Sequence, residues 1–182
     1  MRTALLILLT AMAATGQHVK LSRKKINKEI SVALPSNFAE MTPEDLIQRF
    51  PSVRAPLGAY CDPDRLAAFS VNISATRRPD NNLEFAQGFF KASIMNMFDR
   101  VEMIQEGITE IHGKKFIFFE FDSRLNPEKR NIATQDALVR YTYIMYLLQP
   151  GRTLVFSFSC TRDVRDQWQP LAGPVMKSIR LK

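Results

Sequence analysis

The chain has 182 residues, of which 46% are hydrophobic and 13 are phenylalanine, and its formal net charge is +7. The apolar content excludes an intrinsically disordered chain and suits one domain with a packed core. The positive charge does not indicate nucleic-acid binding, because the domain has no basic stripe with interleaved aromatic side chains.

Residues 1–16 have the pattern of a secretory signal peptide. Arg2 precedes an apolar run, Ala4 to Leu9, and small residues follow up to Gly16. Cleavage after Ala13 and cleavage after Gly16 both fit this pattern. The apolar run is much shorter than the roughly 20 residues of a transmembrane helix. We therefore predict an exported protein, periplasmic or secreted and soluble, without a stable membrane anchor.

Residues 17–29 form a basic leader. Between residues 17 and 30 there are five basic side chains against Glu29 alone, namely Lys20, Arg23, Lys24, Lys25 and Lys28. Without this stretch and Arg2, the remaining chain is close to neutral. We interpret the leader as a solvated segment before the first strand, with weak contact to an anionic lipid or glycan as the alternative.

The rest of the chain, residues 30–182, reads as one domain. In chain order the patterns predict a strand from Ile30 to Leu34, a helix capped by Thr42 and ending at Pro51, strands Leu57 to Cys61 and Ala67 to Ile73, and a longer helix capped by Asn81 or Asn82. Four more strands follow, Val101 to Ile111, Lys115 to Phe121, Val139 to Leu148 and Thr153 to Cys160, before a final helix capped by Asp166.

Two of these strands determine the predicted architecture. The segments from Phe116 to Phe121 and from Tyr141 to Leu148 carry apolar side chains at both odd and even positions. Such strands need cover on both faces of their sheet. We therefore predict an α+β fold, an α/β/α sandwich with a mostly antiparallel sheet of about six or seven strands.

The order of elements, together with the segments from Val32 to Phe38 and from Leu154 to Cys160, resembles the PsbP-like superfamily. That group includes the extrinsic subunit of photosystem II, a Ran-binding nuclear import factor and small exported bacterial proteins of unknown role. The resemblance covers about residues 30–180 and implies an α/β/α sandwich that works by contact, without a catalytic centre. Because its members do different things, it carries no site residue over to this chain.

The sequence offers no group of residues with the spacing of a catalytic, cofactor or metal site. After export only His18 and His112 remain as histidines, and no Gly-x-Ser-x-Gly turn presents a serine, so we predict that the protein is not an enzyme. Cys61 and Cys160 either pair as a disulfide or stay as separate buried thiols, and their spacing does not decide between the two.

Two charged loops are candidate interaction surfaces, one with Arg77 and Arg78 and one with Arg124, Lys129 and Arg130. The leading hypothesis is an accessory module of the cell envelope that binds an envelope protein which the sequence does not identify. A second hypothesis is carriage of a small apolar ligand in a cleft between sheet and helix, lined by Met95, Met97, Phe98, Tyr141 or Tyr143. A hydrolase that uses His112 is the third and weakest.

Overall fold

The computed structural model describes residues 19–50, 54–75, 82–126 and 137–182. The predicted signal peptide and the residues Arg77, Arg78, Lys129 and Arg130 lie outside the described residues.

The elements are, in chain order, β1 (Leu21–Lys25), β2 (Ile30–Pro35), β3 (Ala39–Glu40), α1 (Pro43–Arg49), β4 (Gly58–Cys61), β5 (Ala67–Ile73), α2 (Leu83–Met97), β6 (Arg100–Ile111), β7 (Lys114–Leu125), β8 (Leu138–Gln149), β9 (Arg152–Thr161), the 3-10 turn η2 (Arg162–Val164), α3 (Arg165–Lys177) and β10 (Arg180–Leu181).

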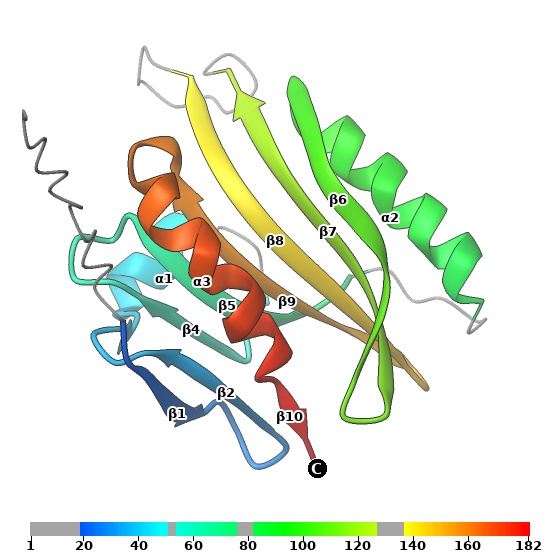
Figure 1. Cartoon of the computed structure of the whole chain (residues 1–182), viewed down its shortest axis with the longest axis horizontal. Helices are drawn as coiled ribbons and strands as arrows, with labels where there is room; N and C mark the ends of the chain where they lie inside the picture. The colour runs from blue at the N-terminus through cyan, green and yellow to red at the C-terminus, as the bar shows by residue number, and fades with distance from the viewer. Residues whose placement is uncertain (1–18, 51–53, 76–81, 127–136) are drawn as a thin grey trace, which may run out of the picture.

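The strands form two antiparallel sheets, which confirms the predicted α+β class. The larger sheet has seven strands in the order β3-β4-β5-β9-β8-β7-β6, and the smaller has three in the order β1-β2-β10. In Figure 1, α3 crosses in front of the large sheet and the small sheet lies on the same side. The helices α1 and α2 pack on the other side, as their contacts show. We call these sides the α3 face and the α2 face.

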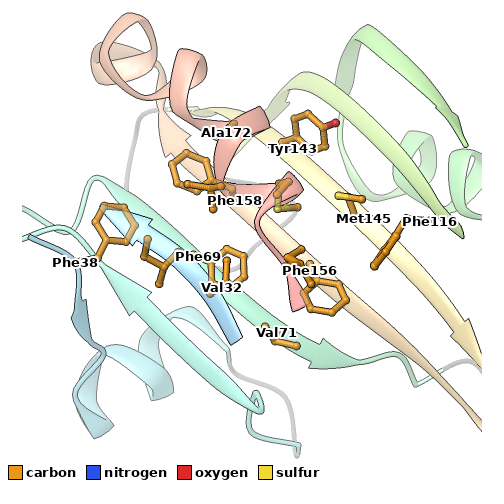
Figure 2. Packing of buried hydrophobic residues seen from close by; sticks show 14 of the residues in the cluster. Val32, Phe38, Phe69, Val71, Phe116, Tyr143, Met145, Phe156, Phe158 and Ala172 are labelled. Carbon is orange, nitrogen blue, oxygen red and sulfur yellow. The ribbon is translucent and has the colours of Figure 1, made fainter. Parts of the chain in front are cut away.

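The α3 face of the large sheet carries the main core. Figure 2 shows side chains from β2, β5, β7, β8, β9 and α3 meeting there. Phe116, Phe156 and Phe158 are fully buried in it, and Trp168 of α3 packs against Phe158. The opposite face of β7 buries Ile117, Phe119 and Phe121 beneath α2. The prediction that this strand is apolar on both faces is therefore confirmed.

The helix starts follow the local sequence in two cases and depart from it in one. Thr42 and Asp45 form a capping box at α1, and the side chain of Asn82 accepts a hydrogen bond from the Phe85 N–H at α2. The prediction that Asp166 caps the final helix is wrong. The 3-10 turn η2 leads directly into α3, so the helix begins one residue before Asp166, with Val164 at its N-cap and no side-chain cap.

Strand β1 was not predicted. Residues 21–25, expected in a solvated leader, pair with β2 through five aligned residue pairs. This strand is an edge of the small sheet and has charged side chains at three of its five positions. It therefore lacks the alternating apolar pattern by which a strand is found in a sequence, and its main-chain hydrogen bonds hold it in place.

Candidate binding site: an arginine-lined pocket at the start of α3

The candidate site is a pocket of about 310 Å³ at one end of the large sheet. It lies where β6 begins, β7 ends, β8 begins, and η2 leads into α3. The antiparallel register brings its parts together, since Arg100 lies opposite Arg124 and Glu102 lies opposite Asp122. We call it the arginine pocket, and its lining residues are Arg100, Glu102, Asp122, Ser123, Arg124, Val139, Arg162 and Arg165.

Arg165, the first residue of α3, is held on three sides. Its Nη1 donates to Oδ2 of Asp122 over 2.7 Å, and its Nε donates to Oε1 of Gln169 over 2.9 Å. Its guanidinium lies 5.9 Å from the ring centre of Tyr141, within the range of a cation–π contact. No partner for Nη2 is found among the described residues. The guanidinium is thus fixed in orientation before any ligand arrives.

A second layer of polar side chains holds the partners of Arg165. Glu120 is only 5% exposed, and its Oε1 accepts hydrogen bonds from the Tyr141 hydroxyl at 2.8 Å and from Nε2 of Gln169 at 3.1 Å. Its Oε2 accepts from Nε2 of Gln105 on the neighbouring strand β6. Gln169 therefore links Arg165 to a buried carboxylate whose two oxygens both accept hydrogen bonds, as a buried polar group requires.

The charges in the arginine pocket are uneven. Four guanidinium groups face two carboxylates, of which Glu102 pairs with Arg100 at 2.5 Å and Asp122 pairs with Arg165. The Nε of Arg124 donates to Oδ1 of Asn126 at 3.1 Å, a neutral acceptor. Arg162 has no carboxylate within ion-pair distance in the described part of the chain. Arg124 and Arg162 therefore form no ion pair with a described carboxylate.

Burial also affects the acidic side of the arginine pocket. Loss of hydration raises the pKa of Asp122 above its usual value, while the neighbouring Arg165 acts in the opposite direction. Burial together with the hydrogen bond to Glu120 raises the pKa of Tyr141, so this hydroxyl stays a donor at every physiological pH. The arrangement suits recognition of an anionic group by arginines, which bind carboxylates and phosphates through two parallel hydrogen bonds.

Of the predicted interaction residues, only Arg124 lies among the described residues, and the structure places it in the arginine pocket. Arg100, Arg162 and Arg165 were not singled out in the sequence, because Arg100 is far along the chain from the other two and only the folded sheet brings them together. Glu120 did carry a signal. It is the one charged residue in the apolar segment from Phe116 to Phe121. Because this strand is covered on both faces of the sheet, a side chain there is buried whichever face it points to.

The two cysteines are free, buried thiols. Strand β5 lies between the strands that carry the two cysteines, β4 and β9. Cys61 lies opposite Ala68 of β5, and Cys160 lies opposite the adjacent residue, Ala67. Since successive residues of a strand point to opposite faces, the two thiols lie on different sides of the sheet. Of the two alternatives left open by the sequence, the structure has separate buried thiols. Burial raises the pKa of the Cys160 thiol to about 12.

The predicted apolar ligand cleft is not formed by the residues proposed for it. Tyr141 and Tyr143 are buried on the α3 face, whereas Met95 and Met97 are exposed on α2. The sheet separates the two groups, so they cannot line one cleft.

His112 sits in the hairpin between β6 and β7, at the far end of both strands from the arginine pocket. Its φ of 50°, next to Gly113 at 75°, matches a two-residue hairpin turn in which both central residues have positive φ. Its role is therefore accounted for by the turn.

The described residues hold neither a metal-binding cluster nor a membrane-spanning helix. No three His, Cys, Asp or Glu side chains are grouped there so that they could hold a metal ion. None of the helices in the described ranges combines the length and apolar composition needed to cross a bilayer.

Comparison with known proteins shows the fold. No protein-family model and no curated protein matches the sequence. Among solved structures, the chain is similar to cyanobacterial PsbP from Synechocystis sp. PCC 6803, with a TM-score of 0.59 and 15% identity over 96% of this chain and 99% of that one.

Two further solved structures have the same architecture. LpqN, which is involved in cell envelope biogenesis of Mycobacterium tuberculosis, matches with a TM-score of 0.56 and 13% identity over 91% of this chain and 92% of its own. The Ran-binding protein Mog1p of Saccharomyces cerevisiae matches with a TM-score of 0.54 and 12% identity over 89% of this chain and 96% of its own. At these identities the likeness concerns the fold.

Proposed function

We propose that this protein, which has the PsbP-like fold, is a non-catalytic accessory module of the cell envelope. In this role it binds an acidic segment of a partner protein in the arginine pocket. The observation that carries the proposal is the fixed orientation of Arg165 by Asp122, Gln169 and Tyr141. An arginine that is already ordered loses little conformational entropy when it binds, so its hydrogen bonds to a ligand carboxylate contribute to affinity.

The neighbouring arginines support an acidic segment as the ligand. Arg124 and Arg162 lie in the same pocket as Arg165 and bring positive charge, and neither forms an ion pair with a described carboxylate. A segment with several Asp or Glu side chains can contact two or three of these guanidinium groups at once. The fold supports a contact role as well, since Mog1p is a Ran-binding protein and LpqN is involved in envelope biogenesis.

A peptide-binding measurement tests the proposal. Fluorescence anisotropy is recorded with a labelled peptide rich in glutamate and with its matched glutamine version. We expect binding of the glutamate peptide only. Arg165→Ala should weaken it at least tenfold, because a hydrogen-bonded charged pair contributes about 1.5–3 kcal/mol.

Two variants serve as controls for this measurement. Arg165→Lys keeps the charge but loses the planar fork, so it should bind nearly as weakly as the alanine variant. Arg152→Ala removes a guanidinium outside the arginine pocket and should bind like the unaltered protein. Equal binding of both peptides, or full binding by Arg165→Ala, would contradict the proposed function.

Export is part of the proposal and has its own test. The intact mass of the protein recovered from the envelope fraction of the producing cell should correspond to an N-terminus at Ala14 or Gln17. A protein found only in the cytoplasm with residues 1–16 attached would overturn the envelope location.

A further inference from the structure

The end of the molecule opposite the arginine pocket gathers basic side chains from four separate segments. These lie in the β1–β2 hairpin, at the start of β7, at the start of β9 and in the C-terminal strand β10 (Figure 1). We call this surface the basic end, and its members are Lys25, Lys28, Lys114, Arg152, Arg180 and Lys182.

Pairing in the small sheet brings the first part of the basic end together. In the small sheet, β1 and β10 flank the central strand β2. Lys25 of β1 and Arg180 of β10 are both paired with Ser31 of β2. Because Ile30 and Val32 point into the core, the side chain of Ser31 and its two neighbours lie on the outer face. Both basic side chains are exposed there.

Hydrogen bonds join this part to the large sheet. The Lys182 N–H donates to the Glu29 carbonyl at 2.9 Å, and the Glu29 carboxylate accepts from Nη2 of Arg152 at 2.8 Å. Nε of Arg152 donates to Oε1 of Gln149 in the β8–β9 hairpin, and Lys114 lines a hollow together with Gln149. The basic end is therefore one continuous surface.

Its charge is strongly one-sided. Among the described residues of this surface, six basic side chains accompany one carboxylate, that of Glu29, which is already paired with Arg152. Lys25, Lys28, Arg180 and Lys182 are exposed, while Lys114 and Arg152 are half-buried. The next basic residue, Lys115, also lines the hollow of Lys114 and Gln149, but it lies beside the carboxylates of Glu84 and Glu110 and is not counted. None of the large exposed apolar side chains belongs to this surface.

We infer that the basic end docks on a bilayer surface containing anionic phospholipid. Four of its six members are lysines, whereas all four basic residues of the arginine pocket are arginines. Lysine is a compact, hydrated point charge on a flexible stem, suited to diffuse attraction, and arginine to directed pairing. Each Lys or Arg close to an anionic membrane adds to the attraction, so several together give reversible binding.

Docking in this way would leave the arginine pocket accessible. The arginine pocket lies at the first residue of α3, and the basic end includes Arg180, three residues after the last residue of α3. A helix of 13 residues spans about 20 Å. A protein held by the basic end therefore presents the arginine pocket away from the lipid surface, toward a partner.

Sedimentation with vesicles tests the inference. The purified protein is mixed with vesicles of phosphatidylcholine alone, or of phosphatidylcholine and phosphatidylglycerol in equal proportion, and the pelleted fraction is measured. We expect pelleting only with phosphatidylglycerol, and its loss at about 1 M salt, where the Debye length falls to about 3 Å. Lys28→Gln with Lys182→Gln should weaken binding roughly 30-fold.

A matched control changes charge at the other end. Arg100→Gln with Arg124→Gln removes the same charge from the arginine pocket and should leave the pelleted fraction unchanged. Circular dichroism verifies that both double variants are folded. Equal pelleting with neutral and anionic vesicles would show that binding does not depend on lipid charge and would overturn the inference.

Two other outcomes would also overturn the inference. One is unchanged pelleting of the Lys28→Gln, Lys182→Gln variant. The other is binding to an anionic polysaccharide such as heparin without any binding to phosphatidylglycerol vesicles. Peptide binding in the arginine pocket is measured separately, so failure of this inference and failure of the proposed function are distinguishable.

Discussion

The α3 face of the large sheet carries one continuous core, whereas the α2 face carries two smaller ones. The α3 face joins 22 buried hydrophobic residues, among them residues of the small sheet, α3 and five strands of the large sheet. On the other face, seven buried residues lie at α2 and four near α1. Between these two groups the register places Thr142, Ser157 and Ser159, whose side chains are half-buried.

This difference indicates how the fold supports its candidate sites. The arginine pocket and the basic end lie at opposite ends of α3, on elements joined by the continuous core. The helices of the α2 face cover the sheet in separate pieces, and α2 buries only Ala86, Phe90 and Ile94. We therefore expect the α3 face to be the rigid platform and the α2 face to be the part that opens locally.

The largest expected effect compares two phenylalanines, one on each face. Phe158→Ala should destabilise the protein by about 4 kcal/mol, because Phe38 and Trp168 hold the cavity open from two sides. Phe90→Ala should cost less, about 3 kcal/mol, since α2 can move toward the sheet and fill part of the space. Urea denaturation measures both values, with the exposed Ile47→Ala as control. An equal or reversed order would contradict the comparison.

The second prediction compares a buried glutamate with a half-buried one. Glu120→Ala should cost about 3 kcal/mol, because it leaves the Tyr141 hydroxyl and the Gln169 amide without acceptors in the α3-face core. Glu106→Ala on the α2 face breaks only an ion pair with Lys91, at 2.7 Å, and should cost less than about 1 kcal/mol. The same denaturation experiment applies.

Glu120→Gln separates hydrogen bonding from charge in this comparison. The amide keeps one acceptor oxygen for Tyr141 and Gln169, so this variant should recover much of the stability lost in Glu120→Ala. If the glutamine variant were as unstable as the alanine variant, the hydrogen-bond explanation would fail.

The smallest expected effect concerns α1 and depends on pH. A hydrogen bond from Arg65, at 2.6 Å, holds the pKa of Asp45 below its usual value of 3.8. A carboxylate with a lowered pKa adds stability above its unfolded pKa, and this is lost as the pH falls through the folded pKa. Asp45→Asn should therefore lower Tm at neutral pH, and the difference should shrink below pH 3.8. A Tm difference that stays constant with pH would contradict this assignment.

The sequence predicted the strands and helices that build the cores on both faces of the sheet. It missed features that depend on main-chain pairing or on the conformation of a preceding turn. The residues from Ala67 to Ile73 form β5 as expected, because apolar and polar side chains alternate from Phe69 to Ile73. Strand β1, with Arg23, Lys24 and Lys25, is held by main-chain pairing that no apolar pattern reveals. The start of α3 depends on the preceding 3-10 turn, so the capping pattern at Asp166 was misleading.

The candidate site was harder to predict for a topological reason. Arg100, Arg124 and Arg165 are more than 20 residues apart along the chain and meet only after the long strands pair and α3 crosses the sheet. A composition-based interpretation also assigned the positive charge to an N-terminal leader. In the fold, Lys25 and Lys28 of that leader join Arg180 and Lys182 from the other end of the chain.

The central claim, that a fixed Arg165 binds an acidic partner, is tested most directly by NMR of the arginine side chains. Spectra of the ¹⁵N-labelled protein are recorded while the glutamate peptide is added, and the Nε–H signal of Arg165 is assigned by its loss in Arg165→Lys. We expect a narrow Arg165 signal before addition and a saturable shift of it during titration, absent with the glutamine peptide. An Arg165 signal that does not move while the peptide binds elsewhere would contradict the claim.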